Sequence, residues 1–215
     1  MVADNLPFPA PPAERAGLLA IDPPWHHESR AAVKNPEIVR SPQRHYATAD
    51  LDHLATIPVR DMCLPDAWVM LWITAPHLAV GAHNFLFRKW GVRPSSIGFV
   101  WIKLNNAFEP DRLLTTPLLE RDLVFGMGFT TRQNAEFCVL GRIGSPRRAR
   151  ADIRQVIISP RREHSRKPEE FYRRAEHYCT GPRIDAFGGK IREGWQHWGY
   201  GHRDGEAPRY PAAAE

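Results

Sequence analysis

The chain has 215 residues, of which 43% are hydrophobic, and this is enough for one domain with a sizeable core. No run of about 18 apolar residues occurs, so no membrane-spanning helix is expected. The formal net charge of +5 is a modest excess, and it fits a polyanionic partner.

Residues 1–15 are rich in Pro and Ala and lack the basic and apolar regions of a signal peptide. We expect them to form a flexible arm, and residues 203–215 a flexible tail, on either side of one domain over residues 16–202. The three cysteines are scattered and form no C-x-x-C pair, which argues against a disulfide framework or a zinc site. This pattern favours a reducing compartment, the cytoplasm.

The first predicted strand, residues 18–21, is continuously apolar and ends at Asp22-Pro23-Pro24-Trp25. The prolines end the strand, because proline has no N–H for a sheet ladder and its φ is fixed. Asp22 therefore lies at the carboxyl end of a buried strand, where open α/β sheets bind their ligands. An acid, an oriented carbonyl and a flat ring suit a planar amine. The alternative is a Pro-rich turn with Trp25 in the core.

A long basic loop follows as far as residue 46, and Thr48 or Asp50 then caps a short helix. We predict a helix that Thr74 caps and Gly91 ends, and another that Pro168 opens. A second long loop covers residues 105–131. The remaining predicted strands are residues 67–73, 97–104, 135–141, 155–159, 183–187 and 194–200.

This alternation of apolar strands and helices predicts a mostly parallel, three-layer α/β sheet. Strands 97–104 and 135–141 have no clear helix between them, and we expect them to pair antiparallel near an edge of the sheet.

Several further segments follow in a specific order. With Asp22 to Trp25 they are His45-Tyr46-x-Thr48, Leu71-Trp72-Ile73-Thr74, Val100-Trp101-Ile102-Lys103, Thr131 to Glu136, Pro160 to Tyr172, Asp185-Ala186-Phe187-Gly188-Gly189 and Gly194-Trp195-x-x-Trp198-Gly199. On these segments the chain resembles the MT-A70 family of adenine-N6 methyltransferases, over roughly residues 18–200. The resemblance implies a Rossmann-like class I fold that uses S-adenosylmethionine, with the catalytic motif first and the cofactor-binding glycines last.

The resemblance places catalysis at Asp22, Pro23, Pro24 and Trp25. The Asp22 carboxylate and the Pro23 carbonyl would accept hydrogen bonds from both protons of the adenine 6-amino group, and Trp25 would stack on an unstacked base. The implied cofactor-binding residues are Ile21, Asp22, Ser165, Lys167, Asp185, Phe187, Gly188, Gly189 and Tyr200.

The implied substrate-binding residues are Tyr46, His45, Lys103, Arg162 and Lys167. For three of these residues an alternative to substrate binding remains open. Tyr46 would pack in the core, Lys103 would form an internal ion pair with Glu136, and Lys167 would lie in a solvated basic loop.

The sequence departs from the family pattern in two places. Gly189 replaces an arginine that helps to hold the cofactor, for which Lys190 or Arg192 would have to substitute, and Tyr200 replaces an asparagine. These changes keep a second hypothesis open, that the chain is a non-catalytic nucleic-acid-binding subunit.

The expected partner is nucleic acid, because nine Lys and Arg residues stand against two acids over residues 142–167. The compact form is similar to bacterial and phage members, which favours DNA over RNA. A homodimer or heterodimer stays open, and we expect no metal, because His26, His27 and His45 lack ligand spacing.

Overall fold

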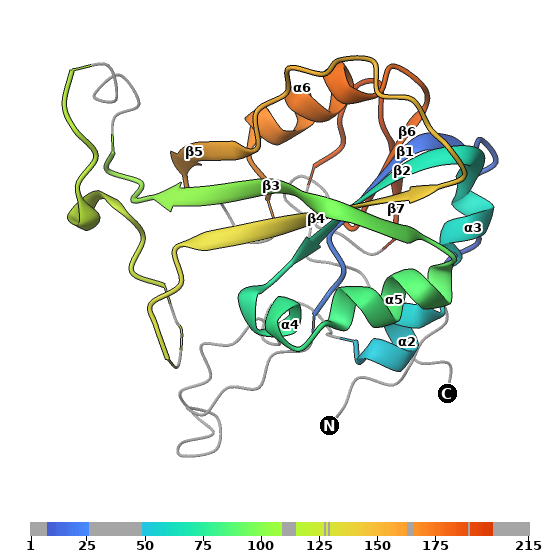
Figure 1. The fold of residues 1–215 in the computed structure, drawn as a ribbon, viewed down its shortest axis with the longest axis horizontal. Coiled ribbons are helices and arrows are strands. Elements are labelled where there is room, and N and C mark those ends of the chain that lie inside the picture. Colours follow the sequence, from blue (N-terminus) through green and yellow to red (C-terminus); the bar gives the residue numbers. More distant parts are fainter. Residues whose placement is uncertain are drawn as a thin grey trace.

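The computed structural model describes residues 8–25, 49–108, 115–126, 128, 130–162, 166–188 and 190–199. A seven-stranded sheet in the order β5-β3-β4-β2-β1-β6-β7 crosses the molecule (Figure 1). The strands are β1 (Ala16–Ile21), β2 (Cys63–Ile73), β3 (Arg93–Leu104), β4 (Ala135–Ile143), β5 (Val156–Pro160), β6 (Arg183–Ala186) and β7 (Gln196–Trp198). The helices are α2 (Leu51–Ala55), α3 (Val59–Met62), α4 (Ala75–Ala79), α5 (Ala82–Trp90), the 3₁₀ turn η3 (Glu120–Asp122) and α6 (Glu169–Tyr178).

The strand directions confirm the mostly parallel α/β sheet. β1 pairs parallel with β2 and β6, and β3 pairs parallel with β5. β4 runs antiparallel to both of its neighbours, β2 and β3. The antiparallel pair of β3 and β4, near the β5 edge, is therefore as predicted.

Helices cover both faces of the sheet, so the three-layer prediction is also confirmed (Figure 1). Successive residues of β1 point to opposite faces, and both faces are buried. Leu19 and Ile21 pack in one core cluster with residues of α2, α3 and α5, and Leu18 and Ala20 pack in the other with residues of α6. A parallel strand that is buried on both faces needs a continuous apolar run, which is why its sequence shows no alternation.

One predicted helix is divided in two. The apolar positions from Leu78 to Trp90 suggested a single helix, but α4 ends at Ala79 and α5 starts at Ala82. Gly81 lies between them with φ +74°, a left-handed conformation that interrupts the helical ladder. Asp50, one of the two predicted caps, does cap α2, since its carboxylate accepts a hydrogen bond from the His53 backbone N–H.

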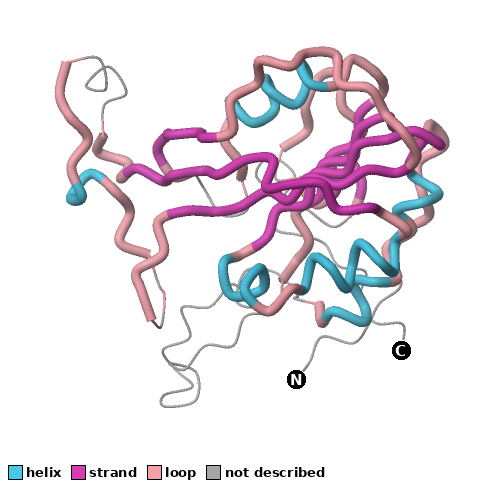
Figure 2. Tube along the Cα trace, in the orientation of Figure 1, coloured by secondary structure: helices cyan, strands magenta, loops and turns pink. Residues whose placement is uncertain are grey.

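The topology collects the predicted site at one edge of the sheet. β1, β2, β3 and β6 end at this edge, and β4, which is antiparallel, begins there. Figure 2 shows the strands running through the middle of the molecule with helices on both sides of them. The backbone N–H of Asp22 donates to the carbonyl of Ala186, which fixes the end of β1 against the end of β6. We call this edge the carboxyl edge and the opposite one the amino edge.

Cys63, Cys138 and Cys179 are all free thiols. Among the described residues, no helix has both the length and the apolar character needed to cross a membrane.

Candidate active site

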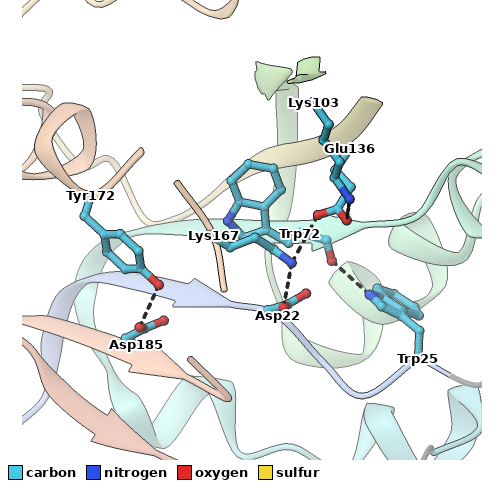
Figure 3. A network of polar contacts seen from close by, with 8 residues as sticks. All are labelled: Asp22, Trp25, Trp72, Lys103, Glu136, Lys167, Tyr172 and Asp185. Carbon is cyan, nitrogen blue, oxygen red and sulfur yellow. Dashed lines mark hydrogen bonds and ion pairs between the residues drawn. The ribbon is translucent and has the colours of Figure 1, made fainter. Parts of the chain in front are cut away.

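Asp22 is held by a buried lysine. Nζ of Lys167 lies 2.7 Å from Oδ2 of Asp22, and only 8% of the Lys167 side chain is exposed. Lys167 comes from the segment before α6, and Asp22 comes directly after β1, so the contact joins two distant parts of the chain (Figure 3). Among the described residues, Lys167 binds Oδ2 of Asp22, and the other carboxylate oxygen, Oδ1, can serve as an acceptor.

A second carboxylate shares the same lysine. Oε2 of Glu136, at the start of β4, lies 3.2 Å from Nζ of Lys167, and Oε1 of Glu136 forms an ion pair with Lys103 at the end of β3. The alternative in which Lys103 is part of an internal ion pair is therefore the one that the structure shows. Two acids and two bases alternate in this network, so its formal charge sums to zero.

Burial and charge act against each other in this network. Burial raises the pKa of Asp22, the Lys167 charge opposes that rise, and the Glu136 charge adds to it. Burial also acts to raise the pKa of Glu136, but the charges of Lys167 and Lys103 outweigh it and lower this pKa to about 2. The pKa of Lys167 is raised, because the two carboxylates outweigh the effect of its burial. Lys167 is therefore a permanent cation beside Asp22.

The segment after Asp22 is fixed by backbone hydrogen bonds. The Pro23 carbonyl accepts from the N–H of Trp25 at 2.8 Å, and the Pro24 carbonyl accepts from the N–H of Ala49 at 2.8 Å. The first bond closes a tight three-residue turn. A carbonyl oxygen has two lone pairs, so Pro23 keeps capacity for one further donor.

Trp25 lies inside the core. Only 4% of its surface is exposed, its Nε1 donates to the Trp72 carbonyl at 3.0 Å, and its ring lies 4.7 Å from the His77 ring. This burial favours the alternative in which Trp25 is a core residue. In this structure the Trp25 ring has no accessible face on which a base could stack.

A third acid, Asp185, lies near the end of β6. Asp185 is 4% exposed, and its Oδ2 accepts a hydrogen bond from the Tyr172 hydroxyl at 2.9 Å. Burial raises the pKa of Asp185 to about 7, although the Tyr172 hydrogen bond and the nearby Arg192 charge act to lower it. Figure 3 shows this pair to one side of Asp22 and Lys167.

The backbone that follows β6 is strained and close to this acid. Phe187 has φ +64°, a left-handed conformation that is uncommon for a residue other than glycine. A Cβ added to Gly188 would lie 1.9 Å from Oδ2 of Asp185, so a larger residue there would displace the carboxylate or the loop. The main chain and the carboxylate thus form a narrow cradle at the carboxyl edge.

Two buried donors point to a bound group. Nε1 of Trp72 and Nε of Arg192 are buried and have no hydrogen-bond partner among the described residues. The Trp72 ring lies 5.4 Å from Nζ of Lys167, and the Arg192 guanidinium lies 3.8 Å from the centre of the Tyr172 ring. Buried donors are normally satisfied, so a ligand with acceptor oxygens or nitrogens between these groups would explain both.

Glu169 joins two arginines at the start of α6. Its carboxylate lies 2.6 Å from Nη1 of Arg192 and 3.5 Å from Nη2 of Arg162. Arg162 is exposed at the carboxyl edge, and among the described residues its ion-pair partner is Glu169 and not Asp22. It can reach a substrate there only after the ion pair with Glu169 opens or is shared.

The other predicted site residues lie outside the described part of the chain. They are His45, Tyr46, Ser165, Gly189 and Tyr200. His26 and His27, at which we expected no metal, also lie outside it. Ile21, the remaining cofactor prediction, is fully buried at the end of β1.

Three residues of this site were not predicted to act in it. Glu136 was expected either to pair with Lys103 or to contact substrate, and it was not among the predicted site residues; its contact with Lys167 was not expected. Tyr172 was assigned to the apolar face of its helix, and Trp72 to a buried strand. The hydroxyl of Tyr172 and the indole N–H of Trp72 belong to side chains that also fit an apolar face, so the sequence gave no sign of their polar role. An acid at the start of an apolar strand, as Glu136 is, is a usable signal of a site residue.

Comparisons with known proteins show which family the sequence matches. The MT-A70 family model matches residues 17–201. A type II methyltransferase, M.MunI from Mycoplasma sp, is 24% identical over 208 residues, which cover 89% of this chain and 80% of the relative.

Two eukaryotic relatives match over a similar part of the chain. The N6-methyladenosine RNA methyltransferase MTA1 of Cryphonectria parasitica is 26% identical over 85% of this chain and 50% of its own length. The non-catalytic subunit METTL14 of the Drosophila melanogaster N(6)-adenosine-methyltransferase is 28% identical over 83% of this chain and 44% of its own length. The chain thus spans about half the length of these two relatives.

Proposed function

The chain belongs to the MT-A70 family of methyltransferases, and from this premise we propose that it methylates the N6 amino group of adenine in nucleic acid, with S-adenosylmethionine as the methyl donor. The observation that carries the proposal is the buried network in which Lys167 holds Asp22 at the carboxyl edge. DNA is the preferred substrate on the sequence argument above, and the free cysteines support a cytoplasmic setting.

The residues at the carboxyl edge suit the proposed cofactor. The narrow cradle of Gly188 and Asp185 and the unpaired donors of Trp72 and Arg192 would hold its polar groups. When bound, S-adenosylmethionine supplies an electrophilic methyl group on a sulfonium. Arg192 is the basic residue that takes the place of the family arginine absent at Gly189, because it reaches the Tyr172–Asp185 pair.

The protein's own groups act on the amine. The nitrogen of an adenine amino group is a weak nucleophile, since its lone pair is delocalised into the ring. Oδ1 of Asp22 and the Pro23 carbonyl would accept hydrogen bonds from the two amino protons, which favours the pyramidal, nucleophilic geometry. Because Lys167 fixes Oδ2, the direction of Oδ1 is set before the substrate arrives.

The same carboxylate can take the proton that must leave. The amine proton is far too weakly acidic before attack, and it becomes labile once the nitrogen carries the new methyl group. Asp22 then accepts this proton at Oδ1. Glu136 keeps Lys167 charged throughout, since its own pKa of about 2 leaves it ionised.

A second function is favoured by two observations. Gly189 and Tyr200 depart from the family pattern, and one relative is named a non-catalytic subunit. In that case the chain would bind nucleic acid within a methyltransferase pair and would transfer no methyl group.

A tritiated methyl-transfer assay on single-stranded DNA, duplex DNA and RNA separates the two functions. The proposed function predicts label in nucleic acid, recovered as N6-methyladenine in nucleoside mass analysis. Calorimetry with S-adenosylmethionine is the companion measurement, and the absence of binding by the isolated protein would favour the non-catalytic subunit.

A further inference from the structure

The most basic stretch of the sequence is divided between the two edges of the sheet. Arg161 and Arg162 follow β5 at the carboxyl edge, whereas β4 carries Arg142 toward the amino edge. Arg142 pairs with Trp68 in the middle of β2, while Asp22 follows Ile21, which pairs with Leu71. At about 3.3 Å per residue, this difference of four positions is about 13 Å along the strands. The two ends of the stretch lie further apart, because Arg142 pairs with Arg93 at the start of β3, whereas Arg161 follows Pro160, which pairs with Leu104 at the end of β3. They cannot contact the same phosphate.

Two arginines at the amino edge face each other. Arg93 of β3 is directly opposite Arg142 of β4, and both side chains are exposed. Like charges in this position are destabilising. Arg93 donates one hydrogen bond, from Nη2 to the Gly144 carbonyl, and neither arginine forms an ion pair with an acid among the described residues. The fold alone gives no reason for this pair.

The turn after β4 adds Arg147 and Arg148, both exposed. Backbone bonds fix this turn beside the end of α6, because the N–H of Ala149 donates to the Tyr178 carbonyl at 2.9 Å. We call Arg93, Arg142, Arg147 and Arg148 the amino-edge arginine cluster.

The nearby acids have other partners. Asp152 accepts two hydrogen bonds from Arg150, and Oδ1 of Asp66 accepts one from the N–H of Ser145 at 2.6 Å. The Ser145 N–H is neutral and leaves the Asp66 carboxylate charged, but the four arginines outnumber this acid, so the cluster keeps a local excess of positive charge.

From this arrangement we propose that the amino-edge arginine cluster binds phosphates of the nucleic-acid strand that flanks the target adenine. The cluster contains arginine and no lysine, and the planar guanidinium fork matches phosphate oxygens. It lies on the α6 side of the sheet, as Trp68 and Arg142 pair across β2 and β4 and Trp68 packs in the α6 cluster.

Its distance from Asp22 sets the position of the contact. Arg142 lies about 13 Å along the strands and two strand spacings, about 10 Å, to the side. A separation of about 16 Å corresponds to about five base pairs of a duplex at 3.4 Å each. The inference rests on the proposed function in one respect, that the polyanion is nucleic acid.

The test is equilibrium binding of a fluorescent 30-base-pair duplex without cofactor, at several salt concentrations. The variant is Arg142→Glu with Arg148→Glu. Glu at position 142 would face Arg93, so the fold should be retained, and the thermal midpoint verifies this. The matched control is Arg60→Glu with Arg88→Glu, which makes the same charge change at exposed positions of α3 and α5 on the opposite face.

We expect the cluster variant to bind about tenfold more weakly and its log–log salt slope to fall by about 2, with much smaller changes in the control. Equal losses in both variants would assign the effect to net charge and overturn the proposal. An unchanged affinity in the cluster variant would also overturn the proposal. The partner of the cluster would then be an acidic protein or a lipid surface. This test measures no methyl transfer, so its outcome does not depend on catalysis. If the cluster variant loses binding and the wild type transfers no methyl group, the proposal for the cluster stands and only the proposed function is refuted.

Discussion

Nζ of Lys167 lies 2.7 Å from Oδ2 of Asp22, although 145 positions separate the two residues in the chain. The contact joins the end of β1 to the segment before α6, so the orientation of the acid depends on how that segment packs. Lys167 is 7% exposed, which means that its charge must be balanced inside the protein. Asp22 and Glu136 provide this balance.

Replacement of Lys167 by Met should destabilise the fold. The change leaves two carboxylates close together with only Lys103 to compensate them, and loss of one partner of a buried ion pair costs about 3–5 kcal/mol. Urea denaturation at pH 7 measures the free energy of unfolding. Lys167→Arg keeps the charge and is the control. A Met variant as stable as the wild type would mean that the network carries little energy.

The Glu136→Gln variant should be less stable than the wild type at neutral pH, and this difference should shrink on the acid side. The folded-state pKa of Glu136 is depressed from 4.5 to about 2, so its contribution is present above pH 4.5 and is lost as the pH falls toward 2. The contribution is on the order of 3 kcal/mol at neutral pH. Unfolding free energies of the two proteins at pH 7 and pH 3 test this, since the gap between them should shrink at pH 3. A constant gap is the contrary outcome.

Asp185→Asn should have the opposite pH dependence. The folded-state pKa of Asp185 is raised from 3.8 to about 7, so the wild type is favoured below pH 4 and loses stability as the pH rises through 7. The loss is at most about 4 kcal/mol. Thermal midpoints from pH 4 to pH 8 should fall more in the wild type than in the Asn variant. Parallel curves would show that Asp185 does not titrate in this range.

Gly188→Ala should weaken cofactor binding with the fold intact. The added methyl group would meet Oδ2 of Asp185 at 1.9 Å, so the carboxylate or the loop must move. Calorimetry with S-adenosylmethionine should show an affinity at least tenfold lower. Gly181→Ala is the matched control, since a Cβ there meets its nearest neighbour, Sγ of Cys179, at 3.9 Å. Equal affinities for both variants would remove Gly188 from the cofactor site.

Much of the fold follows from local sequence signals. The continuous apolar run of β1 and the two prolines that end it placed Asp22 at the carboxyl edge. The missing helix between residues 104 and 135 indicated the antiparallel pair. The division at Gly81 was missed, because the apolar positions on either side keep the same helical face and give no sign of a left-handed residue.

The site was less accessible from the sequence. Lys103 and Glu136 were recognised as a potential ion pair, but the link from Glu136 to Lys167 depends on which loops the tertiary structure brings together. The burial of Trp25 depends on its bond to the Trp72 carbonyl, and one residue type fits a core position and a stacking position equally well. The bond from Tyr172 to Asp185 likewise joins two elements that no sequence spacing connects.

The central claim is that Asp22 acts on the amino group of adenine, and the most direct measurement is methyl transfer by Asp22→Ala beside the wild type. Tritium incorporation into nucleic acid, identified as N6-methyladenine by nucleoside mass analysis, should fall by on the order of 10³-fold. Lys167 keeps Glu136 as a partner in this variant, so the fold and calorimetric binding of S-adenosylmethionine should remain. Transfer by the Ala variant at the wild-type rate would contradict the account.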